Sequence, residues 1–307
     1  MSKQIGVIGV VVSAFAAAAF VAAWSSGFVI AAVATVDVPW TTLLVWRFVP
    51  LAGVLVVLAA ARTSTHRVTR ADLRHQAVIG VFAQFGYCTF VYAAIAAGVA
   101  TGTSALIDAA QPLVVATLVG PLLGLRVRGG QWAGLIVGAL GVALVIGSQL
   151  GGSQAPPAAF LLLAGAMACL VAGTFVERRQ DARLPVLTTL TVHVVVTAAA
   201  FVVLAAGTGT LAPPMTSAFW LSALLSALVP TVLAYGLYWW LLRRLGITAV
   251  NALLFLVAPA TALASALLLA EPLAPVTVAG FALCGAGVAA VLVADDRRRP
   301  RAARVST

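Results

Sequence analysis

The chain has 307 residues, of which 63% are hydrophobic and 8% are charged, and its formal net charge is +10. Soluble domains average roughly 45–50% apolar and about 25% charged residues, so this composition excludes a soluble globular protein. A positive charge of this size would suggest a nucleic-acid partner for a soluble protein, but here the basic residues lie between apolar stretches. We therefore expect an all-α membrane protein that binds no nucleic acid.

Ten apolar stretches are each long enough to cross the hydrocarbon core of a bilayer as a helix, which takes roughly 20 residues. The connections between them are short, and none could fold as a soluble domain of its own. The predicted spans are residues 5–28, 39–61, 76–97, 101–124, 130–149, 158–177, 185–206, 217–241, 247–269 and 273–293. Function is therefore expected to reside among the helices.

The first span has some features of a signal peptide, because Lys3 precedes an apolar run with small residues near Ala17 to Ala23. The span continues to Ile30, however, and it has a counterpart in the second half of the chain. We expect it to remain in the protein as a membrane helix.

Basic residues gather on alternate connections. Of the 18 lysines and arginines, 17 lie before the first span, on every second connection or in the C-terminal segment, whereas the other connections carry only Asp37 and Glu271. Because cytoplasmic loops hold the excess of Lys and Arg, both termini are predicted to face the cytoplasm, across the cytoplasmic membrane. The basic tail at 297–307 is expected to anchor this topology, and binding of anionic lipid headgroups is the alternative.

The two halves of the chain are related by a repeat. Residues 122–146 match residues 268–292 at an offset of 146. Further matches at offsets of 146 to 148 are Pro39 with Pro185, Tyr87 with Tyr235, Gly98 with Gly246 and Pro112 with Pro259. Since each unit has five spans, an odd number, the second unit must enter the membrane from the opposite side. We predict inverted five-helix repeats over residues 1–150 and 151–296, an arrangement that many transporters use to expose a central site to each face in turn.

Five segments carry a resemblance to a known family. They are AAWSSGFVI, VWRFVPL after Pro39, GYCTFVYAAIAAGVATGTSAL followed by Pro112, LAYGLYWWLLRRLGITAVNALLFLVAP, and LLLAEPLAPVTVAGFALCGAGV. In order, spacing and duplication they resemble the EamA group of the ten-helix drug/metabolite transporter superfamily. The resemblance implies a carrier of the cytoplasmic membrane, usually an exporter of amino acids, related metabolites or toxic compounds.

One position departs from the family pattern. Each half of such proteins often ends its fourth helix with a Gly-Glu pair, whereas here Glu271 follows Ala270 and Gly124 is followed by Leu125. A role that needs two symmetric carboxylates is therefore not expected. We interpret Glu271 as a helix-capping residue at the outer face, and a functional role is the alternative.

Three ionisable side chains, Arg47, Asp108 and His193, lie inside predicted spans. Insertion of such groups costs roughly 2.5–3.5 kcal/mol each, so they are expected to face the bundle interior or a cavity. At about 1.5 Å per residue, Arg47 and Asp108 both lie on the order of 10–12 Å from the outer ends of their spans, a depth at which they could form an ion pair. The family resemblance favours a structural role for Arg47.

Asp108 has a second interpretation. Desolvation of an isolated carboxylate disfavours its charged form, which suits proton coupling, and the same group could pair with an amine on the solute. His193 occupies the position of Arg47 in the second half, where it is either proton-linked or an ordinary packing residue.

Polar and aromatic side chains of the first, third, fourth, eighth and ninth spans are predicted to line a central cavity. The first, third and fourth helices of each repeat do so in related transporters. The expected substrate-binding residues are Trp24, Ser25, Gln84, Tyr87, Asp108, Gln111, Tyr235, Tyr238, Trp239 and Asn251. Aromatic walls with a few amides suit small amphipathic solutes. Some of these aromatic residues are expected to serve packing alone.

Prolines and glycines mark sites where helices can bend or approach closely. Pro112 and Pro259 interrupt equivalent helices and predict either a kink or a hinge. The glycines of the fifth and tenth spans allow close contact with a neighbouring helix or, alternatively, with a second copy in a homodimer.

Other functions find little support in the sequence. HExxH, GxSxG and P-loop motifs are absent, and the three histidines are scattered, so we expect neither an enzyme nor a cofactor nor a metal site. The leading prediction is a facilitated or proton-linked exporter whose partners are a small-molecule substrate and membrane lipids. A channel or a lipid flippase is the alternative.

Overall fold

The computed structural model describes residues 2–62, 68–123, 129–152, 155–177, 184–245 and 247–296. The helices of the first half are α1 (Ser2–Ala34), α2 (Trp40–Ala61), α3 (Arg70–Gly80), η1 (Val81–Gly86), α4 (Tyr87–Ala96), α5 (Thr101–Leu123) and α6 (Gly129–Gly152). Those of the second half are α7 (Ala159–Glu177), α8 (Val186–Thr208), α9 (Ser217–Ala227), η2 (Leu228–Leu233), α10 (Ala234–Leu245), α11 (Ile247–Leu269) and α12 (Pro275–Asp296). The basic tail at 297–307 lies outside the described residues.

The described residues form ten continuous helices, as the ten apolar stretches predict. α3, η1 and α4 run on without a break, and so do α9, η2 and α10. Six of the ten are long and apolar enough to cross a membrane, and shorter apolar stretches occur in α6, α11 and α12. The chain is therefore a multi-pass membrane protein.

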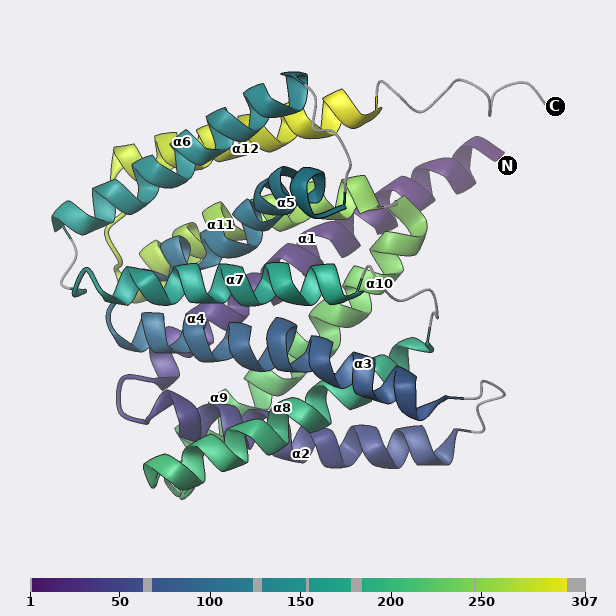
Figure 1. Ribbon diagram of the computed structural model, residues 1–307, viewed down its shortest axis with the longest axis vertical. Helices are drawn as coiled ribbons and strands as arrows, with labels where there is room; N and C mark the ends of the chain where they lie inside the picture. The colour runs from purple at the N-terminus through teal and green to yellow at the C-terminus, as the bar shows by residue number, and fades with distance from the viewer. Residues whose placement is uncertain are drawn as a thin grey trace.

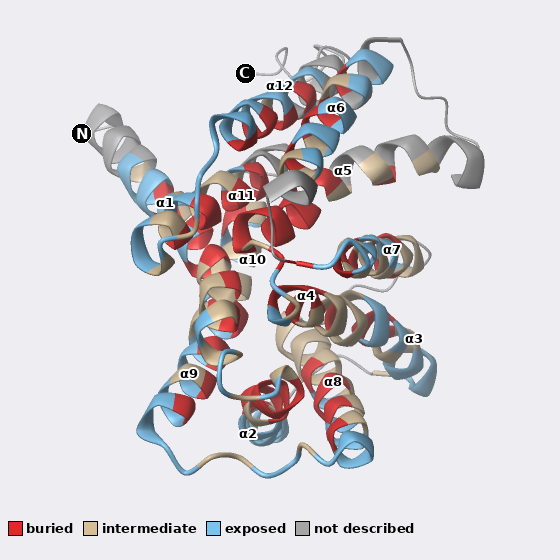
Figure 2. Cartoon of the chain, turned by 90° about the vertical axis from the view of Figure 1, so that its left-hand side faces the viewer, coloured by how far each residue is buried: buried red, intermediate tan, exposed pale blue. Residues whose placement is uncertain are grey.

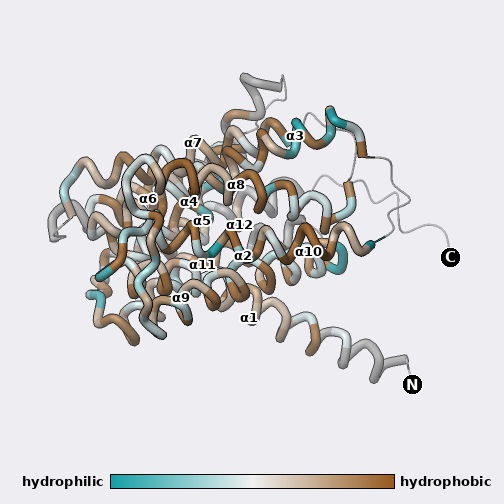
Figure 3. Tube along the Cα trace, turned by 90° about the horizontal axis from the view of Figure 1, so that it is seen from below, coloured by the Kyte–Doolittle hydropathy of each residue, from teal (hydrophilic) through white to brown (hydrophobic). Residues whose placement is uncertain are grey.

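Large apolar side chains cover the outside of the bundle. Phe15 is 76% exposed, Leu161 is 72% exposed and Val203 is 72% exposed, and hydrophobic segments run along most of the helices (Figure 3). In water such a surface would promote aggregation, whereas in a bilayer it faces hydrocarbon of the same polarity. The backbone also suits the bilayer, because a helix satisfies its own backbone hydrogen bonds.

The two halves interlock around a pseudo-twofold axis. α2 packs on α8, α5 on α11 and α6 on α12, and each of these pairs joins equivalent helices of the two halves. Several other contacts between the halves come in matching sets, since α4 with α7 is mirrored by α1 with α10, and α3 with α8 by α2 with α9. In the view along the bundle, buried faces of helices from both halves point towards the middle (Figure 2).

The first turn of α1 and the last turn of α12 lie at the same end of the bundle, which we call the terminal end (Figure 1). The last turns of α2, α7 and α10 and the first turns of α3, α8 and α11 also lie towards that end. The connections after α1, α4, α8 and α11 lie at the opposite end.

The contacts of α1 and α7 within their own halves break the symmetry. α1 lies close to both α4 and α5. The equivalent pairs would be α7 with α10 and α7 with α11, and the described parts of these helices make no close contact with one another. α4 runs from the middle of the bundle to the end opposite the termini, and α10 from the middle to the terminal end. The first half is therefore closed around α1 at the end opposite the termini, whereas the described part of the second half is not closed around α7 in the same way at the terminal end.

Glycines bring α6 and α12 into close contact. A Cβ atom added to Gly287 would lie 2.5 Å from the backbone nitrogen of Gly138, and one added to Gly280 would lie 2.4 Å from a methyl carbon of Val145. The glycine faces that suggested contact with a neighbour thus pack against each other within the chain. A homodimer through the outer faces of these two helices stays a prediction.

Glu271 acts as a helix cap, which confirms its interpretation as helix-end chemistry. Its carboxylate accepts hydrogen bonds from the backbone nitrogen of Thr101 at 3.2 Å and from the Thr101 hydroxyl at 3.1 Å. These donors stand at the first residue of α5, where backbone N–H groups have no partner within the helix and the helix dipole favours a negative charge. Glu271 follows α11 in the second half and caps the start of α5, which is the equivalent helix of the first half.

Substitution of Gly287 by Ala is expected to destabilise the α6–α12 contact. The new methyl group would collide with backbone, and overpacking of this kind costs about 1–3 kcal/mol. Gly285→Ala is the matched control, because a Cβ atom at Gly285 meets nothing within 4 Å. Thermal unfolding in detergent should show a lower midpoint for Gly287→Ala alone; equal midpoints for the two variants would contradict the packing described above.

Candidate functional site

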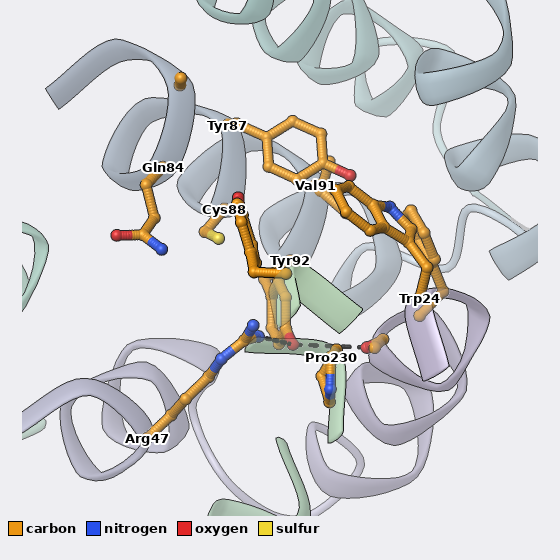
Figure 4. Close-up of a pocket in the computed structure, with 12 residues that line it drawn as sticks. Trp24, Arg47, Gln84, Tyr87, Cys88, Val91, Tyr92 and Pro230 are labelled. Carbon is orange, nitrogen blue, oxygen red and sulfur yellow. Dashed lines mark hydrogen bonds between the residues drawn. The ribbon is translucent and has the colours of Figure 1, made fainter. Parts of the chain in front are cut away.

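A small cavity of about 50 Å³ lies between the two halves (Figure 4). The first half contributes side chains from α1, α2, η1 and α4, and the second half from η2 and α10. The lining residues are Trp24, Gly27, Phe28, Arg47, Ala83, Gln84, Tyr87, Cys88, Val91, Tyr92, Pro230 and Tyr235. The wall is thus mostly aromatic and apolar, with one cation and one amide.

Two π-helical segments at equivalent positions of the two halves border the cavity. η1 contributes Ala83 and Gln84, and η2 contributes Pro230. Pro230 has no backbone N–H and its ring crowds the preceding turn, so the regular α-helical ladder cannot pass through it. η1 contains no proline, and its sequence offers no comparable reason for the wider turn.

Arg47 is 6% exposed, and among the described residues its hydrogen-bond partners are neutral groups. Its Nη1 atom donates to the Tyr92 hydroxyl at 2.6 Å, while Nε and Nη2 donate to the Thr231 hydroxyl at 3.2 and 2.8 Å. The guanidinium carbon also lies 4.8 Å from the ring centre of Phe48 and 5.8 Å from that of Tyr92. Arg47 thereby joins α2 and α4 of the first half to η2 of the second.

Arg47 and Asp108 do not form the ion pair that their similar depth allowed, so that interpretation is wrong. The Oδ2 atom of Asp108 instead accepts hydrogen bonds from Trp24 Nε1 at 2.8 Å and from the Tyr87 hydroxyl at 3.0 Å. Asp108 is 4% exposed and lies behind these two residues, which line the cavity themselves. Its carboxylate therefore affects the cavity indirectly, because it fixes the positions of Trp24 and Tyr87 by hydrogen bonds.

The remaining polar residues of the predicted site fall into two groups. Gln84 lies on the cavity wall, where its amide oxygen accepts from the Thr197 hydroxyl at 3.1 Å. His193 lies away from the cavity, with Nε2 2.9 Å from the side-chain oxygen of Gln76 on α3. It is thus equivalent to Arg47 in sequence but differs from it in surroundings.

Several predicted residues pack outside the cavity wall. The Ser25 hydroxyl donates to the carbonyl oxygen of Val257 at 3.3 Å, and Gln111 donates to the Thr174 hydroxyl at 2.9 Å. Tyr238 stands 6.4 Å from the ring of Trp24 and 5.6 Å from that of Trp239, as part of an aromatic cluster beside the cavity. These contacts join helices and do not reach the empty space.

The two prolines and Asn251 give less information. α11 continues through Pro259 from Ile247 to Leu269. The side chains of Pro112 and Asn251 lie outside the described residues. A hinge at the prolines stays a prediction, as does solute binding by Asn251.

The EamA-like transporter family model matches residues 6–147 and again residues 157–293. The chain belongs to this family. A solved crystal structure of a protein that is 22% identical in sequence shares the fold of the transporter with a TM-score of 0.62, over 93% of this chain and 98% of the other. A comparison with curated proteins finds no match. The double match confirms the inverted-repeat membrane transporter that the duplication predicted.

Sequence reasoning places Tyr92 near the centre of the bundle but misses Thr231, which completes the site. Tyr92 and Thr231 are the hydrogen-bond acceptors of Arg47, and Thr231 is fully buried. A threonine within an apolar span carries no signal of its own. The neighbouring Pro230 is the signal that could have found it, because a proline inside a predicted helix marks an irregular turn.

Substitution of Thr231 by Val is expected to destabilise the transporter. It removes the acceptor of two guanidinium hydrogen bonds and leaves part of a buried charge unsatisfied, at a cost of about 1–3 kcal/mol or more. Thr261→Val is the matched control, since the Thr261 hydroxyl is equally buried and has no hydrogen-bond partner among the described residues. The thermal unfolding midpoint in detergent should be lower for Thr231→Val and unchanged or higher for Thr261→Val. The reverse order would contradict the hydrogen-bond network of Arg47.

Proposed function

We propose that the protein is a secondary transporter that carries small solutes through the central cavity by alternating access. The observation that carries the proposal is the composition of the wall, to which π-helical segments of both inverted halves contribute. When the two inverted halves exchange conformations, such a wall changes on both sides at once.

The proposed topology has ten membrane crossings in the cytoplasmic membrane with both termini in the cytoplasm. The first turn of α1 and the last turn of α12 share one end of the bundle (Figure 1). Arg62, Arg70, Arg243 and Arg244, which flank connections at that terminal end, support its cytoplasmic location by the excess of basic residues on cytoplasmic loops.

The contacts of α1 and α7 support a conformation that is open towards the cytoplasm. α1 closes on α4 and α5 at the outer side, while α7 lies apart from the described residues of α10 and α11 at the terminal end. In an inverted repeat the alternative state is reached when the halves exchange these roles. α7 would then close on α10 and α11 as α1 opens.

The proposed solutes are amino acids, related metabolites or small amphipathic compounds, and the proposed direction is export. Trp24, Tyr87 and Tyr235 give the wall aromatic faces that bind apolar groups and attract cations. The sequence contains no P-loop, so a solute gradient or coupled protons supply the energy. Asp108 is the candidate proton carrier.

Transport by purified protein in liposomes tests this function. Radiolabelled amino acids and aromatic amines should accumulate or exchange with a rate that saturates as their concentration rises. A conductance without saturation would favour a channel, and movement of labelled lipid between leaflets without solute transport would favour a flippase.

Asp108→Asn is expected to flatten the dependence of transport on pH while preserving the local geometry. The asparagine side-chain oxygen can still accept from Trp24 and Tyr87, so the substitution removes chiefly the titratable charge. Tyr87→Phe is the control, because it deletes one of these hydrogen bonds and keeps the carboxylate. Transport assayed in liposomes across a range of pH should separate the two, and an unaltered pH profile in Asp108→Asn would sink proton coupling through this residue.

A further inference from the structure

Arg47 carries a positive charge on the cavity wall that no described residue neutralises. No carboxylate of the described chain lies within 4 Å of its guanidinium, and its three hydrogen bonds go to the hydroxyl groups of Tyr92 and Thr231. Guanidinium has five N–H donors, so two of them remain free of these hydrogen bonds. In Figure 4 the head of Arg47 lies beneath Tyr92 within the group of lining residues.

A buried charge without a counter-ion is costly, and the surroundings of Arg47 lower this cost only in part. The faces of Phe48 and Tyr92 stabilise the cation by their ring quadrupoles. They supply no negative charge, and removal of an ion from water without a partner costs several kcal/mol. An anion that entered the cavity would therefore be attracted by the positive charge of the Arg47 guanidinium.

We propose that Arg47 binds an oxyanion, the carboxylate or phosphate group of a solute that the cavity takes up. The planar fork of guanidinium matches either group through paired hydrogen bonds. Trp24 and Tyr235, whose ring centres are 5.5 Å apart, provide an apolar surface on the same cavity for the rest of the solute. The site thus selects anionic or zwitterionic amphipaths over their uncharged analogues, and this selection rests on the proposed function of the cavity as a solute path.

Asp108 gives the cavity a second and opposite preference. Its carboxylate lies behind Trp24 and Tyr87 and favours a cationic group on that side. A comparison between solutes must therefore vary the anionic group alone. Phenylacetate with phenylacetamide, and phenylalanine with phenylalaninamide, are pairs of that kind, and phenyl phosphate tests the second oxyanion.

Binding of these probes to the full-length transporter in detergent, measured by calorimetry, tests the proposal. Phenylacetate or phenyl phosphate should bind about 10- to 100-fold more tightly than phenylacetamide, the range expected for hydrogen bonds to a charged group. The preference should disappear in Arg47→Gln and be reduced in Arg47→Lys, which keeps the charge and loses the fork. Arg244→Gln removes a cation of α10 that donates to Ser13 outside the cavity wall, and it should leave the preference unchanged.

Equal affinity of the wild-type protein for each acid and its amide would overturn the proposal, and this comparison needs no variant that might lose its fold. A preference that persisted in Arg47→Gln would overturn it as well. The oxyanion site and the transport function fail separately. Arg47-dependent binding without liposome transport would contradict only the function, whereas saturable transport of phenylacetate and phenylacetamide alike would contradict only the site.

Discussion

The hydrogen bonds of Arg47 hold the two halves together where the bundle can least tolerate a charge. A single guanidinium bridges α2, α4 and η2, and its acceptors are hydroxyl groups that an apolar helix can carry at little cost. The wide turn of η2 includes both Thr231 and the cavity-lining Pro230. The same interaction thus joins the repeats, fixes a wall of the cavity and leaves a positive charge facing the space between them.

The duplicated chain provides a symmetric scaffold with asymmetric chemistry. Equivalent helices pack on each other across the pseudo-twofold axis, and both halves have a π-helical segment at the same place. The charged residues have no such symmetry. His193 stands where the repeat would place Arg47, and Phe255 where it would place Asp108. In the proposed mechanism, the symmetry serves the exchange between two conformations, and its local loss lets one half of the cavity recognise the solute.

The sequence predicted the helices and the two repeats well because both depend on patterns that run over long stretches of the chain. Apolar stretches set the ten helices, and offset matches set the two units. It failed at contacts between single side chains. Depth along a helix brought Arg47 and Asp108 to one level but could not tell which way each faces, so their ion pair was wrong. Tyr238 and Trp239 were predicted to bind the solute but pack beside the cavity. The prediction failed for the same reason, since an aromatic run in the sequence does not show which ring reaches the empty space.

Distances between spin labels at both ends of the bundle test alternating access most directly. Labels at Glu177 and Arg243 report on α7 and α10 near the terminal end, and labels at Val33 and Ala96 report on α1 and α4 at the opposite end. In liposomes, addition of a transported solute should shift the first distance to shorter values and the second to longer ones. If both distances stayed fixed while transport continued, or both changed in the same direction, the two halves would not exchange roles and the account would be contradicted.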